Sequence, residues 1–157
     1  MNDISRFRIL LVIACWLACF ASHAQTPEQI TAARTLLGKT APSDVPARCA
    51  RLVATAPEKG RVAVAAAVGQ AVAGVHPKMV VQTISAIAHR APGAAPAAAA
   101  AAAGELPGLA AAIAGAAAAV PGVEAKEVIS AVTVAVPSKV REIESAVDSA
   151  LAASARR

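Results

Sequence analysis

Apolar residues recur at helical spacing in several segments of the chain, and each of these segments follows a proline. The segments after Pro27, Pro77, Pro121 and Pro137 place an apolar residue at every third or fourth position, which is the period of one helix face. In the last of them the apolar stripe consists of Val140, Ile143, Val147 and Leu151. The charged residues of that segment lie off the stripe. The pattern predicts a series of short amphipathic helices.

Two other segments alternate apolar residues in the way that a half-buried strand would. They are RVAVAAAV, beginning at Arg61, and AVTVAV, beginning at Ala131, and both contain the β-branched Val that strands favour. Alanine fills their remaining positions, and alanine is the strongest helix former. Val64, Val68 and Val72 also recur at helical spacing. We therefore expect an all-α protein of about seven or eight short helices, each of the length common in globular proteins.

The prolines recur at regular intervals. Proline is favoured at the first helical position, because it has no amide hydrogen to leave unpaired and its φ angle is already helical. Pro77, Pro107 and Pro137 follow one another at intervals of 30 residues. The prolines that we expect to open helices are Pro27, Pro46, Pro57, Pro77, Pro92, Pro107, Pro121 and Pro137. The spacing predicts helical hairpins of about 30 residues stacked as a small solenoid, and regular gaps that arise by chance are the alternative.

Residues 91–105 contain little except alanine and proline. The simplest interpretation is a short helix whose small side chains let neighbouring backbones approach closely. A flexible Pro/Ala linker over 91–105 is the alternative. A membrane span is disfavoured, because Pro96, Glu105 and Pro107 interrupt the apolar sequence before it reaches the roughly 20 residues that a span needs.

The N-terminal segment 1–24 has the three parts of a secretory signal peptide. A basic start precedes an unbroken apolar run over 9–20, and small residues follow it up to Ala24. The run has 12 residues, which is too short to cross a bilayer. We expect cleavage after Ala24, so that Gln25 begins a mature chain located in the periplasm or outside a bacterial cell.

Basic residues concentrate in the first half of the mature chain. Residues 25–90 carry a net charge of +5, whereas residues 91–155 carry −3. A basic half favours contact with an anionic surface such as lipid headgroups. The candidate contacts are Arg34, Lys39, Arg48, Arg51, Lys59 and Arg61. Residues 25–157 contain no aromatic side chain on which nucleic-acid bases could stack. With export in addition, we expect no nucleic-acid partner.

The sequence offers little reactive chemistry. It has no G-x-S-x-G, P-loop, G-x-G-x-x-G, H-E-x-x-H or C-x-x-C motif. His76 and His89 are the only histidines of the mature chain, and nothing in their spacing brings them together with Cys49 as metal ligands. We therefore expect no enzymatic activity, no cofactor and no metal site.

Cys49 is the only cysteine outside the signal segment, so the mature chain has no intramolecular disulfide. Arg48 and Arg51 flank it, and nearby cations lower the pKa of a thiol and make it reactive. Cys49 is therefore a candidate reactive or intermolecular thiol. The alternative is a buried residue that behaves as a small hydrophobic side chain.

Segments such as APEKGRVAVAAAV, HPKMVVQTISAIA and VPSKVREIESAV resemble the alanine-rich, proline-punctuated helical repeats of secreted bacterial proteins. This resemblance covers residues 57–150 and implies an exported helical array, without an activity or functional residues. We expect a non-enzymatic protein with a structural or protein-interaction role, whose small-residue surface contacts a protein partner or a second copy. A peripheral binder of the membrane or envelope surface, using the basic half 25–90, is the alternative.

Overall fold

The computed structural model describes residues 27–156, and these residues fold into α-helices and short 3-10 turns without a strand. The α-helices are α2 (Pro27–Gly38), α3 (Val45–Thr55), α4 (Glu58–Val75), α5 (Val80–Arg90), α6 (Ala95–Glu105), α7 (Ala110–Ala118), α8 (Ala125–Ala135) and α9 (Val140–Ser154). The expected all-α fold of about seven or eight short helices is confirmed. Both alternating Val/Ala segments are helical, in α4 and α8. The segment 1–24, where we expect a signal peptide cleaved between Ala24 and Gln25, lies outside the described residues.

Five 3-10 turns, each beginning with a proline, precede helices of the array. They are η2 (Pro42–Asp44), η3 (Pro77–Met79), η4 (Pro92–Ala94), η5 (Pro107–Leu109) and η6 (Pro137–Lys139). The proline ring disfavours the helical region for the residue before it, and the residues before η3, η4, η5 and η6 lie outside that region, so the preceding helix ends there.

His76 illustrates how such a junction works. Its φ and ψ are −133° and 64°, outside the helical region. Its N–H still donates to the Val72 carbonyl at 2.8 Å, and its carbonyl accepts from the Met79 N–H at 2.9 Å. The same pair of hydrogen bonds recurs at Ala91, Leu106 and Val136. One pre-proline residue therefore completes one helix and starts the next, without a loop between them.

The expected unit of 30 residues is a pair of helices, and each helix with its 3-10 turn occupies about half of it. Pro77, Pro92 and Pro107 begin successive turns at intervals of 15 residues, so an interval of 30 spans two helices with their turns. Three prolines do not open helices as expected. Pro57 immediately precedes α4, Pro46 is the second residue of α3, and Pro121 lies in the turn before Glu124, the N-terminal cap of α8.

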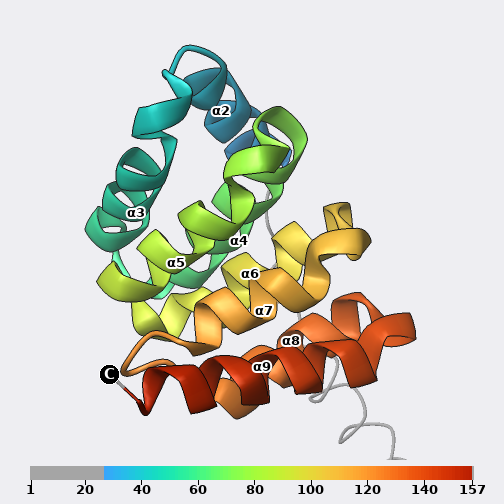
Figure 1. Ribbon diagram of the computed structural model, residues 1–157. Coiled ribbons are helices and arrows are strands. Elements are labelled where there is room, and N and C mark those ends of the chain that lie inside the picture. The colour runs from blue at the N-terminus through green and yellow to red at the C-terminus, as the bar shows by residue number, and fades with distance from the viewer. Residues whose placement is uncertain (1–26, 157) are drawn as a thin grey trace, which may run out of the picture.

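Helices two apart in the sequence make the most extensive contacts. α4 packs against α2 and α6, and α6 packs against α8, while α3, α5, α7 and α9 pack in succession beside them. In Figure 1, α2 and α3 lie at one end of the array, α8 and α9 lie at the other, and α6 and α7 lie between. Each helix therefore packs mainly against the helices two before it and two after it in the sequence.

Alanine supplies much of the core. Residues 95–105, where a flexible linker was the alternative, form α6, and Ala98, Ala99, Ala102 and Ala103 have no exposed surface. α6 is enclosed because it packs against both α4 and α8. The larger fully buried side chains, such as Ile84, Ile113 and Ile143, come from α5, α7 and α9.

The contact between α4 and α6 is close enough to involve the backbone itself. A methyl group added to Gly69 of α4 would overlap the carbonyl oxygen of Ala98 and lie 3.1 Å from its carbonyl carbon. Gly115 of α7 faces the Ala146 carbonyl of α9 in a similar but looser contact, with 3.3 Å between the added carbon and the oxygen. Glycine at position 69 is therefore required by the separation of the two helices.

We expect Gly69→Ala to destabilise the fold, because the added methyl meets backbone atoms that cannot rotate away. Overpacking of this kind costs about 2–3 kcal/mol, which corresponds to a fall in melting temperature of roughly 5–10 °C for a domain of this size. Gly104→Ala is the matched control, since no atom lies within 4 Å of its added carbon. That variant should be as stable as the wild type or up to about 1 kcal/mol more stable. Equal melting temperatures for both variants would contradict the close contact.

The apolar stripe of the last helix faces inward at its centre. Ile143 and Val147 have no exposed surface, and α9 packs mainly against α7. Val134 of α8 is 81% exposed and therefore offers a matched control for substitution. We expect Val147→Asp to lower the free energy of unfolding by more than about 3 kcal/mol, because it buries a charge without a partner.

Thermal unfolding followed by circular dichroism tests this expectation. Val134→Asp should change the unfolding free energy by no more than about 0.5 kcal/mol, because its side chain stays in water. A melting curve of Val147→Asp that coincides with that of Val134→Asp would show that the stripe of α9 is not packed.

Candidate functional site

The six basic residues that the sequence singled out occupy different helices. Arg34 lies on α2, and its guanidinium lies beside Gly74 of α4. Arg61 of α4 is half-buried and donates to the Ala56 carbonyl at 3.3 Å, and its Nε has no partner among the described residues. Lys39 follows α2 and Lys59 lies in the first turn of α4, both exposed. The structure does not bring these four residues together into one site.

Arg48 and Arg51, by contrast, line one hollow on the outer surface of α3. They lie three residues apart on the same helix face, and Arg90, the last residue of α5, lines the same hollow. Ala47 and Asp44 complete its lining. The sequence analysis missed Arg90, because its place beside α3 depends on the packing of α5 against α3.

A short hydrogen-bond relay fixes Arg48 at the edge of the hollow. Its guanidinium donates to the Thr40 hydroxyl at 3.0 Å, and that hydroxyl donates to the Leu36 carbonyl at 2.8 Å. Thr40 is only 6% exposed, so its position is well defined by packing. The relay ties α3 to the end of α2 and limits the positions that the Arg48 side chain can take.

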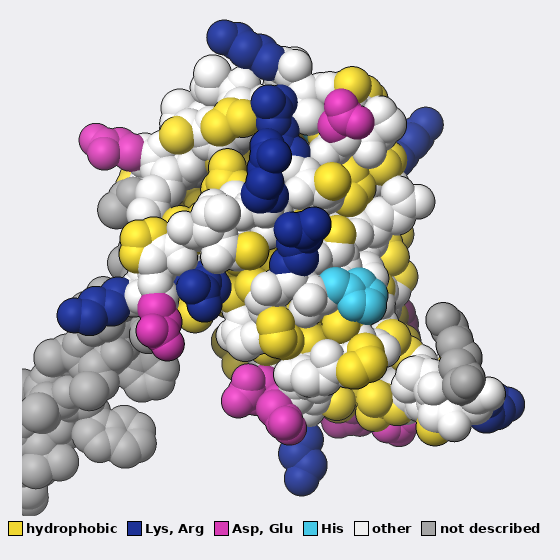
Figure 2. Space-filling view, turned by 90° about the vertical axis from the view of Figure 1, so that its left-hand side faces the viewer, with side chains coloured by type: hydrophobic (Ala, Val, Ile, Leu, Met, Phe, Trp, Pro, Cys, Tyr) yellow, Lys and Arg dark blue, Asp and Glu magenta, His cyan; other side chains and the backbone are white. Residues whose placement is uncertain are grey.

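Positive charge on this face is poorly balanced. Figure 2 shows Lys and Arg side chains following one another down the face that carries α3, with acidic side chains mostly at its edges. Within residues 27–156 the one ion pair joins Lys139 to Glu142, at 2.7 Å on α9. No ion pair among these residues therefore neutralises Arg48, Arg51 or Arg90, although Asp44 lies in the same hollow.

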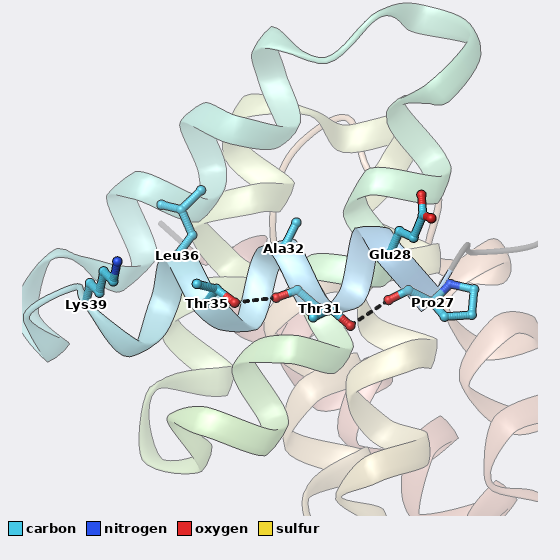
Figure 3. Close-up of a pocket in the computed structure, with 7 residues that line it drawn as sticks. All are labelled: Pro27, Glu28, Thr31, Ala32, Thr35, Leu36 and Lys39. Atoms are coloured by element: carbon cyan, nitrogen blue, oxygen red, sulfur yellow. Dashed lines mark hydrogen bonds between the residues drawn. The ribbon is translucent and has the colours of Figure 1, made fainter.

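The outer face of α2 forms a second surface feature. Figure 3 shows its seven lining residues along one side of this single helix and just beyond its end, so it is an exposed helix face and not an enclosed cavity. The hydroxyls of Thr31 and Thr35 donate to the carbonyls of Pro27 and Thr31, each at 2.9 Å. Both hydroxyls are thereby satisfied within the helix. Leu36 is 42% exposed on this face, and it lies beside Lys39.

Cys49 points into the protein between α2, α3 and α4. Its side chain is buried in a small apolar gap lined by residues such as Leu37, Leu52 and Val68. Burial raises the pKa of the Cys49 thiol to about 12. Arg48 lines both this gap and the hollow on the surface, whereas Arg51 lines only the hollow, and burial is the effect that raises the pKa of the thiol. The structure therefore corresponds to the small hydrophobic side chain that was the alternative to a reactive thiol.

His76 and His89, the two histidines within residues 27–156, occupy separate positions. His76 is half-buried, and its Nε2 lies 3.2 Å from the Leu37 carbonyl, whereas His89 is exposed in the last turn of α5. In the part of the chain that the structure describes, no three His, Cys, Asp or Glu side chains group as metal ligands would. None of the helices in that same part combines the length and apolarity of a membrane span.

No protein-family model, curated protein or solved structure matches the chain.

The burial of Cys49 makes its reactivity dependent on unfolding. We expect iodoacetamide at pH 8 to modify Cys49 at least 100-fold more slowly in the folded protein than in denaturant, because the thiolate is the reacting species and is scarce when the pKa is near 12. Peptide mapping by mass spectrometry resolves Cys49 from any other cysteine. Equal rates in the folded and unfolded protein would show that the thiol is accessible.

The same raised pKa has a consequence for stability. The ordinary pKa of a cysteine thiol is 9.0. Between pH 9 and 12 the folded protein therefore keeps a Cys49 proton that the unfolded chain has lost. The Cys49 contribution to stability is therefore complete below pH 9 and is lost as the pH rises toward 12. Cys49→Ala should weaken this alkaline dependence of the melting temperature.

Proposed function

We propose that the protein is an exported, non-enzymatic interaction protein, and that its basic face contacts a negatively charged partner in the cell envelope. The observation that carries this proposal is the row of unpaired arginines on the outer surface formed by α3 and the end of α5. Unpaired cations on one face attract an oppositely charged surface and steer its approach.

Because the alanines are mostly inside the molecule, a charged surface is a better candidate for contacting a partner than a surface of small residues. The alanines of α6 are mostly buried against α4 and α8, so their close-packing surfaces are used within the molecule. Among the exposed residues, the charged ones differ most between one end of the array and the other. Acidic and basic side chains are mixed on α8 and α9, whereas the α3 face carries mainly arginines, and this asymmetry favours one orientation of a charged partner.

Capture from envelope extract at two salt concentrations tests the proposal. The exported protein should retain a partner in about 50 mM salt and release it in about 500 mM, because salt screens contacts between exposed charges. Arg51→Glu should abolish this capture. Lys126→Glu makes the same charge change on α8, at the other end of the array, and should leave capture intact. If Arg51→Glu captures the same partner as the wild type, the basic face is not the contact surface.

A peripheral membrane binder is the second candidate, and the outer face of α2 favours it. This face places an exposed Leu36 beside Lys39, and apolar and basic residues side by side are the combination by which a helix lies in a membrane interface. Co-sedimentation with anionic and zwitterionic vesicles tests this candidate. Leu36→Gln should weaken binding to anionic vesicles several-fold, while Thr31→Ser, which keeps a hydroxyl on the same face, should have little effect.

A further inference from the structure

The hollow lined by Arg48, Arg51 and Arg90 has the features of a site for a particular chemical group. We propose that it binds the phosphate groups of a ligand. This inference deepens the proposed function, and rests on it, by naming what the basic face recognises.

The three arginines form a row and not a single cluster. Arg48 and Arg51 lie three positions apart on α3, which separates their backbones by about 4.5 Å along the helix axis. Arg90 extends the row from the end of α5, which packs against α3. Ala47 lies in the same lining and carries only a methyl group, so the space in front of the guanidinium groups stays open.

The neighbouring groups do not neutralise the positive charge of the three arginines. Three arginines and Asp44 give the hollow a net charge of +2, and no ion pair joins the carboxylate to any of the three guanidinium groups. Thr40 holds Arg48 in place with a single hydrogen bond, which leaves the other N–H donors of that guanidinium for a ligand. The site therefore has positioned donors and a charge that an anion can neutralise.

Phosphate fits this arrangement better than carboxylate. A guanidinium presents a planar fork of donors that matches two oxygens of either group. One carboxylate is satisfied by one such fork, whereas a phosphate group has further oxygens that a neighbouring arginine can reach. A row of arginines is therefore used more fully by adjacent phosphate groups than by separate carboxylates.

Titration calorimetry with inorganic tripolyphosphate tests the site on the purified exported protein. We expect tripolyphosphate to bind at least about tenfold more tightly than citrate, whose somewhat smaller negative charge is carried on carboxylates. Arg51→Gln and Arg90→Gln should each weaken tripolyphosphate binding roughly tenfold, since each removes charge-assisted hydrogen bonds. Lys59→Gln removes the same charge from an exposed position outside the hollow and should change the affinity less than twofold. Melting curves confirm that each variant is folded.

The results separate the site from general charge attraction. Equal affinity for tripolyphosphate and citrate, or equal loss in Lys59→Gln and Arg51→Gln, would overturn the phosphate site. If such a protein still captured its envelope partner in a salt-dependent way, the proposed function would stand without this inference. If that capture were lost as well, both the phosphate site and the proposed function would be wrong.

Vesicles distinguish the two sources of phosphate. If lipid headgroups are the natural ligand, the protein sediments with phosphatidylglycerol vesicles, does not sediment with phosphatidylcholine vesicles, and is released by tripolyphosphate. If the ligand is a soluble phosphate compound, tripolyphosphate binds and neither type of vesicle sediments the protein. Both results support the phosphate site, whereas vesicle binding that tripolyphosphate does not compete for would contradict it.

Discussion

The backbone contact between Gly69 of α4 and Ala98 of α6 sets the spacing at the centre of the array. Two helices approach this closely only when neither carries a side chain larger than a methyl group at the crossing point, and here one carries none. α6 then packs against α8 on its other side, so the same alanine-rich helix joins the two halves of the molecule. A core built largely from alanine is stabilised because many van der Waals contacts at short distance replace those of a few large side chains.

The pre-proline junctions make this packing regular. Each one ends a helix and begins a 3-10 turn, and two backbone hydrogen bonds satisfy both the N–H and the carbonyl of the pre-proline residue. Short connections of similar geometry, at His76, Ala91, Leu106 and Val136, turn the chain in the same way each time. Helices two apart are thereby placed side by side, and α3 is brought against α5.

That placement connects the fold to the proposed contact surface. Arg90 ends α5 and reaches the hollow on α3 only because those two helices pack together. With the alanines used inside the molecule, the distinguishing chemistry of the surface is its charge, and the arginine row is where that charge is least balanced. The packing of α5 against α3 therefore holds arginines that are distant in the sequence, Arg51 and Arg90, around one hollow.

The sequence by itself determined the helices, because alanine propensity and apolar periodicity act over a few residues and the prolines mark where each helix must stop. It also indicated that Ile143 and Val147 are buried. It did not determine that helices two apart make the most extensive contacts, since the proline spacing marks only where helices end. Nor did it determine that Cys49 is buried, or that Arg90 joins Arg48 and Arg51. Those outcomes depend on which helix faces which, and only tertiary packing decides that.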